Sequence, residues 1–276
     1  MTDTRRLAVI GCGIMGEAIV GGLLRAGLLA PAEVVATARR QDVADALRER
    51  HGVVTTLDNL VACRDAETVL LTLKPQRIAK VVHQAGIREA LAGKLVISIA
   101  AGVTLTQLAG WLPQSAVIRA MPNTPCLIGE GMTVLARGPG VGDAAVAAAT
   151  RLFETVGRCI EVEDKLMDAV TSLGGSGPAF VYIMIEAMAD GGVMMGLPRP
   201  VALQIAAQVF QGAARMVLQT SRHPAALKDQ VTTPAGCTIA GILTMEDGRI
   251  RSVLARTIQE ATRVAGELGK DAAADR

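Results

Sequence analysis

Short apolar runs alternate with segments of helical periodicity between Leu7 and about Val162. This alternation is typical of a doubly wound α/β sheet, in which parallel strands are connected by helices. Ligands bind such sheets at the carboxyl ends of the strands, so the residues after each run should converge on one crevice. We predict strands at Leu7–Ile10, Val34–Thr37, Thr68–Thr72, Leu95–Ile99 and Val117–Ala120, with Met132–Ala136 as a further candidate.

After about Glu163 the pattern is helical throughout. The segment Phe180–Met195 is apolar almost all round, and a helix of that kind needs cover on every side. One small domain does not easily provide it, so we expect a second copy of the chain to do so. We therefore predict a domain over 1–163, an all-α domain over 164–276 that forms an intertwined homodimer, and room for further assembly.

The chain begins its first helix on a glycine motif. Gly11, Gly13 and Gly16 match GxGxxG, directly after a predicted strand and before the amphipathic segment Glu17–Ala26. The first glycine permits a tight turn, the second lets a pyrophosphate approach the backbone, and the third lets helix and strand pack closely. This context predicts a Rossmann-type dinucleotide site, which also includes Ile14 and Met15.

The end of the second predicted strand bears on the choice of cofactor. An NAD site usually places an acidic residue there to bind the ribose 2′-hydroxyl. This chain has Arg39 and Arg40 instead. Arginine binds a 2′-phosphate through a planar, charge-assisted fork, so the pair favours NADPH, with NADH possible. A solvated charge at a helix start is the alternative for Arg40.

A turn rich in hydroxyls and small residues lies between two helical patterns near the C-terminal end. Backbone N–H groups in such a turn, at a helix N-terminus, form a site of carboxylate size without Arg or Lys. On spacing alone an ordinary helix cap is the alternative. The turn contains Thr232, Thr233, Pro234, Ala235, Gly236, Cys237 and Thr238.

Composition narrows the class of protein. The net charge is +2 and aromatic residues make up 2 % of the chain, which argues against nucleic-acid binding. Five scattered cysteines without ligand spacing indicate reduced, buried residues of a cytoplasmic protein, and three isolated histidines give no metal signature. We expect no transmembrane segment, because the uncharged stretch Ala169–Ile185 is broken by glycines and a proline.

These features together resemble the pyrroline-5-carboxylate reductase family. The resemblance covers nearly the whole chain and is most specific in LKDQVTTPAGCTIAGI, at 227–242. It also includes IGCGIMG at 10–16, LKPQ at 73–76, SIAAGVT at 98–104, RAMPNTPCLIGEGMT at 119–133, GGSGPAFVY at 174–182 and DGGVMMGLP at 190–198.

The resemblance implies reduction of Δ1-pyrroline-5-carboxylate to L-proline with NADPH or NADH, the last step of proline synthesis. It implies a Rossmann domain followed by a helical dimerisation domain, often assembled into larger rings such as a decamer. The Thr232–Thr238 turn would hold the substrate carboxylate, and Thr238 would reach the imine nitrogen as the catalytic donor. The cofactor site would include Asn59 at the adenosine end and Leu73, Lys74, Pro75, Ala100, Ala101 and Asn123 at the nicotinamide end.

The chain departs from the usual family pattern in two places. Gly174 stands where the family commonly has serine, and Thr233–Pro234–Ala235–Gly236 stands for Ser–Pro–Gly–Gly. Thr233 keeps the hydroxyl and adds a methyl group. Ala235 would restrict the backbone if that position is left-handed.

Two other functions compete with this one. A β-hydroxyacid dehydrogenase also joins a Rossmann domain to helices, but it uses a helical lysine, and no lysine occurs between Lys165 and Lys228. A non-catalytic NADP sensor would share the glycine motif, although it would have no use for the Thr238 turn. Lys74 is more typical of a solvated lysine than of a proton donor.

Overall fold

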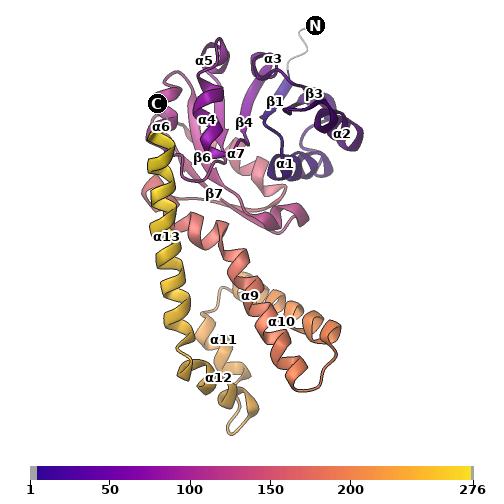
Figure 1. Ribbon diagram of the computed structural model, residues 1–276, viewed down its shortest axis with the longest axis vertical. Helices are drawn as coiled ribbons and strands as arrows, with labels where there is room; N and C mark the ends of the chain where they lie inside the picture. Colours follow the sequence, from indigo (N-terminus) through magenta and orange to yellow (C-terminus); the bar gives the residue numbers. More distant parts are fainter. Residues whose placement is uncertain (1–4, 275–276) are drawn as a thin grey trace. The chain divides into compact units, whose positions relative to one another are not determined.

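The computed structural model describes residues 5–274, which fold as two compact units (Figure 1). The first unit comprises the chain up to Ser176 and the stretch from Glu260 onward, and the second comprises Gly177–Gln259. The long helix α13, Ile250–Ala274, therefore belongs to both units. The domain boundary predicted at residues 163 and 164 stays a prediction.

The first unit is built on one sheet of eight strands within the described residues, in the order β3-β2-β1-β4-β5-β6-β7-β8. All neighbours pair in parallel except β6 and β7, which are antiparallel. The strands are β1 Arg5–Ile10, β2 Val34–Thr37, β3 Val54–Thr56, β4 Ala66–Leu71, β5 Leu95–Ser98, β6 Ala116–Met121, β7 Gly131–Arg137 and β8 Gly157–Glu161.

Helices cover both faces of this sheet, as the apolar periodicity predicts (Figure 1). One buried cluster joins the sheet to α3–α6, and the other joins it to α1, α2 and α7. The α-helices are α1 Ile14–Arg25, α2 Gln41–His51, α3 Asn59–Arg64, α4 Pro75–Val82, α5 Ile87–Leu91, α6 Leu105–Trp111, α7 Asp143–Glu154 and α8 Met167–Val170. Shorter turns are η1 Pro31–Glu33, η2 Thr124–Ile128, η3 Asp164–Leu166 and the π-helix η4 Thr171–Gly175.

The second unit is helical, with α9 Gly177–Met194, α10 Arg199–Thr220, α11 Pro224–Val231, α12 Cys237–Asp247 and the first part of α13. Its own core is small. Ala189, Ala202 and Ala206 form the buried cluster where α9 and α10 lie side by side (Figure 1). Large apolar side chains remain exposed, among them Ile183 at 65 %.

One helix among the described residues, α10, is long and apolar enough to cross a membrane by length and composition alone, and 11 % of that apolar window is buried. A core helix of a soluble protein passes the same test. The stretch Ala169–Ile185, which we considered from the sequence, instead forms the end of α8, the π-helix and the start of α9.

Candidate cofactor and substrate sites

The loop between β1 and α1 is shaped by three glycines that differ in their surroundings. Gly11 has a φ of +77°, and a Cβ there would lie 2.3 Å from Leu73 Cδ2. A Cβ on Gly16 would lie 2.8 Å from Thr72 Oγ1, so α1 packs directly onto the sheet. At Gly13 the nearest atom to such a Cβ is 3.9 Å away. The loop thus has a left-handed turn at Gly11, close packing at Gly16 and open space at Gly13. This combination lets a pyrophosphate approach the backbone.

The first turn of α1 offers free backbone donors. Its N-cap is Gly13, so no side chain caps the helix, and Ile14 is 75 % exposed. Uncapped N–H groups at the positive end of a helix dipole form an anion site. The residues fit the dinucleotide that the motif predicts.

Two threonines fix this loop, and the sequence analysis did not single them out for that role. Thr37 is 1 % exposed, and its Oγ1 accepts the Gly11 N–H at 2.8 Å. Thr72 Oγ1 lies 2.9 Å from the Gly11 carbonyl oxygen, to which it donates. Thr37 is the last residue of the buried strand β2 and Thr72 directly follows the buried strand β4, and a threonine at each strand end is the signal that could have revealed them. Together they hold the turn from both sides.

The two arginines after β2 lie in different settings. Arg40 is the N-cap residue of α2 and pairs with Asp42, with Nη2 and Oδ2 at 3.0 Å. Arg39 is exposed, and we find no ion-pair partner for it among the described residues. Arg39 is therefore the better placed of the two to bind a 2′-phosphate, while Arg40 has the solvated helix-start position that we left open.

The loops predicted to line the cofactor follow strands that end in register. Ile10 pairs with Leu71, Leu71 with Ser98, and Ser98 with Arg119, so β1, β4, β5 and β6 finish at one edge of the sheet. That edge brings together the glycine loop and the segments Leu73–Pro75, Ala100–Ala101 and Asn123. Lys74 is exposed at the N-cap of α4, and Asn59 opens α3 beside the Asp58 cap.

Both polar atoms of the Asn123 side chain form hydrogen bonds within the first unit. Its Nδ2 donates to the Gly174 carbonyl oxygen at 3.0 Å, and its Oδ1 accepts the Met132 N–H at 2.9 Å. The side chain therefore joins the end of β6 to β7 and to the π-helix. As a cofactor contact, Asn123 would act chiefly by shaping the loop.

The Thr232–Thr238 turn lies between α11 and α12 in the second unit. Gly236 is the N-cap of α12 and provides no side-chain cap, so the first-turn amides of α12 point from an uncapped helix end. Gly236 and Thr233 are close: a Cβ on Gly236 would lie 2.4 Å from Thr233 Oγ1. Thr232 Oγ1 donates to the Lys228 carbonyl oxygen at 2.9 Å and so closes α11.

Ala235 occupies the left-handed region, with a φ of 54°. Its Cβ makes this conformation less favourable than it would be for glycine. The restriction that we expected at this departure from the family pattern is therefore present. Thr233 and Cys237 are exposed, while Thr238 on the first turn of α12 is partly buried.

The five cysteines differ in how deeply they are buried, which the sequence did not indicate. All five are free thiols, but Cys237 is exposed and Cys159 is partly buried, so the prediction of uniformly buried cysteines is wrong. Burial, with a smaller contribution from Glu17, raises the pKa of the Cys12 thiol to about 12. Cys12 therefore stays neutral beside the glycine loop, where a thiolate would repel a pyrophosphate.

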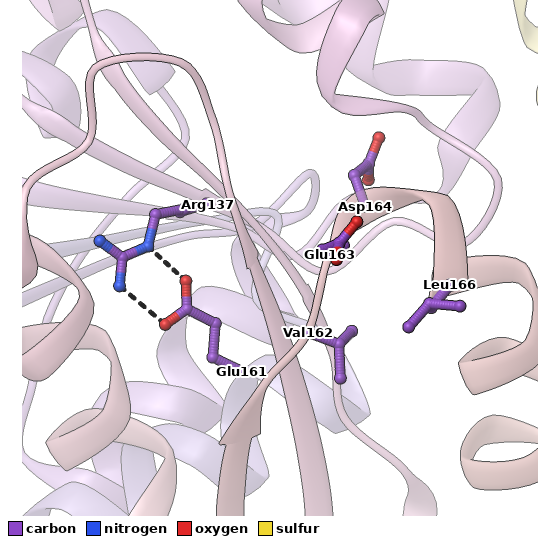
Figure 2. A pocket seen from close by; sticks show the side chains of 6 residues that line it. All are labelled: Arg137, Glu161, Val162, Glu163, Asp164 and Leu166. Atoms are coloured by element: carbon purple, nitrogen blue, oxygen red, sulfur yellow. Dashed lines mark hydrogen bonds and ion pairs between the residues drawn. The ribbon is translucent and has the colours of Figure 1, made fainter.

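A pocket elsewhere in the first unit contains none of the predicted site residues (Figure 2). The Arg137 guanidinium forms two parallel bonds with the Glu161 carboxylate and so lowers the pKa of Glu161. Arg137 is the cation of this lining, and because two carboxylates already neutralise it, the lining is unsuited to a dinucleotide phosphate. The pocket is lined by Arg137, Glu161, Val162, Glu163, Asp164 and Leu166.

Comparison with known families divides the chain into two matches. Residues 164–268 match a family described as pyrroline-5-carboxylate reductase dimerisation. Residues 6–102 match a family described as NADP oxidoreductase, coenzyme F420-dependent. The first match covers the helical part and the second covers the glycine loop.

Similar proteins are pyrroline-5-carboxylate reductases along almost their full length. The one from Schizosaccharomyces pombe is 42 % identical over 278 residues, covering 95 % of this chain and 98 % of that protein. The solved structure of the one from Coxiella burnetii has a TM-score of 0.90 at 33 % identity and covers 96 % of this chain and 98 % of the other. The Plasmodium falciparum enzyme, solved with NADP bound, has a TM-score of 0.85 at 25 % identity. The match covers 98 % of this chain and 100 % of the other.

Proposed function

Because this chain belongs to the pyrroline-5-carboxylate reductase family, we propose that it reduces Δ1-pyrroline-5-carboxylate to L-proline with NADPH. The observation that carries the proposal is the 42 % identity to a reductase across 95 % of the chain, since it spans both parts of the site. The competing dehydrogenase has no support, because the helical part matches the reductase dimerisation family and has no lysine between Lys165 and Lys228 to act as the acid–base group.

The cofactor would be held at the carboxyl edge of the first unit's sheet. Gly13 and the uncapped α1 amides would bind its pyrophosphate, and Arg39 would bind its 2′-phosphate. Leu73, Pro75 and Ala100 would form the apolar wall of the nicotinamide end. When bound, the reduced nicotinamide supplies the hydride.

The substrate would be held by the Thr232–Thr238 turn. Its single carboxylate suits the uncapped amides of α12 and the Thr233 hydroxyl, which need no cationic side chain. The Thr238 hydroxyl would donate a hydrogen bond to the imine nitrogen and pass on a proton from water. Hydride transfer to an imine demands orientation more than a strong nucleophile, so a hydroxyl is a sufficient acid–base group.

Self-association follows from the dimerisation family and from the large exposed apolar side chains of α9 and α10. We propose that dimers assemble further into a ring such as a decamer. We also propose a cytoplasmic location, because five free thiols suit a reducing compartment. The charge of +2 and the few aromatic residues support the absence of a nucleic-acid partner, and we propose that no membrane partner exists.

The test is the loss of reduced-nicotinamide absorbance when the protein meets pyrroline-5-carboxylate and NADPH. We expect turnover by the wild-type protein and a fall of about 10²-fold in kcat for Thr238→Val, which removes the donor but keeps the shape. No turnover with NADPH or NADH would refute the proposed reaction.

Thr244→Val is the matched control for this substitution. Thr244 lies on the same helix, and its hydroxyl donates to the Ala240 carbonyl oxygen at 3.2 Å. We expect its kcat to stay within about twofold of wild type, because that bond is local to the helix. Wild-type activity in Thr238→Val would keep the reaction and remove Thr238 from its mechanism.

A further inference from the structure

Arg119 is the charged member of the buried polar residues in the described chain. It lies on β6 and is 3 % exposed. Its Nη1 donates to Asp164 Oδ1 at 3.2 Å, and its Nη2 is 3.5 Å from Asp168 Oδ1. Nη2 has no hydrogen-bond partner among the described residues.

Apolar residues flank Arg119 along β6. Val117 and Met121, two residues before and after it on β6, belong to or pack on the cluster that contains buried Met167. A buried ion pair seldom stabilises a fold more than apolar residues of the same size, because its desolvation is costly. A methionine would fill this position without leaving an unpaired donor. The buried charge of Arg119 is therefore better explained by a role other than filling the core.

The two aspartates begin a continuous helical segment, Asp164–Gly175, which we call the strap. It consists of η3, α8 and the π-helix, and it leads to Ser176, where the first of the two stretches of the first unit ends. Arg119 holds the beginning of the strap against β6. Its end is held by Asn123, which donates to the Gly174 carbonyl oxygen, and a Cβ on Gly175 would lie 2.5 Å from Met121 Cε.

The strap is thus fastened at both ends to the last residues of β6 and to the loop that follows. Asn123 shares its carboxamide between the strap and the Met132 amide, so a shift of the strap would move the β6–η2 loop. Ser172 Oγ also lies 2.7 Å from Thr262 Oγ1, which links the strap to the part of α13 in the same unit.

We infer that Arg119 is a positioning residue: its bridge to Asp164 and Asp168 sets the strap, and through it the Asn123 carboxamide beside the nicotinamide end of the cleft. The inference rests on the proposed reductase function. It predicts that removing the bridge disturbs the orientation needed for hydride transfer more than it disturbs cofactor binding. Small displacements at a reacting centre cost about 10²-fold in rate.

The experiment compares Arg119→Met with Arg137→Met in the full-length protein. Arg137 is a matched control, since it also bridges two carboxylates, Glu161 and Asp143, but its side chain is 36 % exposed. We expect kcat to fall about ten- to a hundredfold in Arg119→Met, with the KM for the imine and the Kd for NADPH within about threefold of wild type. Arg137→Met should keep the wild-type kcat.

Two further readouts separate positioning from mere stability. Hydrogen exchange at the Met132 amide, whose acceptor is Asn123 Oδ1, should accelerate in Arg119→Met and not in Arg137→Met. Arg119→Lys restores a charge that reaches one carboxylate, so it should recover part of the lost kcat. A lowered melting temperature with wild-type kcat and unchanged Met132 exchange would overturn the inference.

If Arg119→Met does not fold, Asp168→Asn decides the question. Asp168 is 43 % exposed, so the fold should tolerate the change, and we expect kcat to fall several-fold with KM unchanged. An unchanged kcat in that variant would overturn the inference. If the wild-type protein shows no turnover at all, the proposed function fails, and the exchange of Met132 still tests the strap without any reaction.

Discussion

A Gly–Cys pair occurs in the loop before α1 and another at the start of α12, and the surroundings of the two pairs differ strongly. At α1 the cysteine is Cys12, which is 4 % exposed, and the loop is held by bonds from Thr37 and Thr72, residues distant in sequence. At α12 the cysteine is Cys237, which is exposed. The hydrogen bonds of that turn are local, such as Gly236 N–H to the Thr233 carbonyl oxygen at 3.1 Å.

The comparison shows how much of each site one chain completes by itself. The glycine loop is set between strands of a large buried sheet, so its shape is fixed by the first unit alone. The Thr232–Thr238 turn belongs to a unit whose buried cluster is three alanines with exposed apolar side chains around it. We therefore propose that the cofactor site is complete in a single chain and that the Thr232–Thr238 turn depends on the dimer for its shape.

Gly11→Ala should have the largest effect on stability. The substitution combines a left-handed φ of +77° with a Cβ 2.3 Å from Leu73 Cδ2, so we expect a loss of about 2–4 kcal/mol in the free energy of unfolding and loss of NADPH binding. Gly27→Ala is the control, because its φ is +65° with nothing within 4 Å of its Cβ. Urea denaturation measures both, and equal losses would show that the contact with Leu73 is unimportant.

Ile205→Asp should come next, by breaking the dimer. Ile205 lies on α10 and is 50 % exposed in the single chain, where such a change would cost little. At the core of an interface it should cost more than about 2 kcal/mol of dimer stability. Leu57→Asp, at a 48 % exposed position in the first unit, is the control. Light scattering after size exclusion should show monomers for Ile205→Asp, and dimers there would place α10 outside the interface.

Arg39→Glu should weaken NADPH binding and spare NADH. A lost charge-assisted bond to a phosphate is worth about 1.5–3 kcal/mol, or about 10- to 100-fold in Kd. Arg40→Glu should have a smaller effect, because Arg40 is paired with Asp42. Titration of reduced-nicotinamide fluorescence measures both cofactors. The same loss for NADPH and NADH would contradict a role in binding the 2′-phosphate.

The buried thiol of the glycine loop should make stability fall in alkaline solution. The folded protein keeps the Cys12 proton up to a pKa of about 12, whereas the unfolded chain loses it near the ordinary value of 9.0. The unfolded state then binds fewer protons, so the free energy of unfolding falls between these pH values, by up to about 1.4 kcal/mol per pH unit. Cys12→Ala should reduce this slope. Cys237→Ala is the control, and an equal reduction there would contradict burial as the cause.

Ala235→Gly should have the smallest effect. The left-handed φ of 54° favours glycine, but glycine also gives the unfolded chain more freedom. We expect a net gain of at most about 1 kcal/mol in the free energy of unfolding. Thermal melting measures this change in stability, and the KM for the imine is measured in parallel. A clear loss of stability would show that the alanine methyl group makes favourable contacts.

Strands with continuous apolar runs could be predicted from the sequence, and the other elements of the sheet could not. All six predicted strands are confirmed to within two residues at each end. The short strand β3 and the half-exposed edge strand β8 were not predicted, because neither has an apolar run. The antiparallel direction of β7 was not predicted either, since an apolar run in the sequence does not indicate the direction in which the strand pairs.

The candidate site also contains some features that the sequence predicts and others that it does not. The glycine loop and the Arg39–Arg40 pair after β2 could be proposed as cofactor contacts from the sequence, because each is a local motif. The bonds of Thr37 and Thr72 to the loop join residues 26 and 61 positions apart, and the Arg119 bridge spans 45. Such partners are chosen by the folded sheet, so spacing along the chain does not reveal them.

The most direct test of this account is to measure NADPH binding and imine turnover in monomeric Ile205→Asp. We predict a Kd for NADPH within about threefold of wild type, because the first unit forms the cofactor site alone, together with loss of turnover. Monomers that turn over the imine at the wild-type rate would contradict the dependence of the substrate turn on the dimer. Folded monomers that no longer bind NADPH would contradict the independence of the cofactor site.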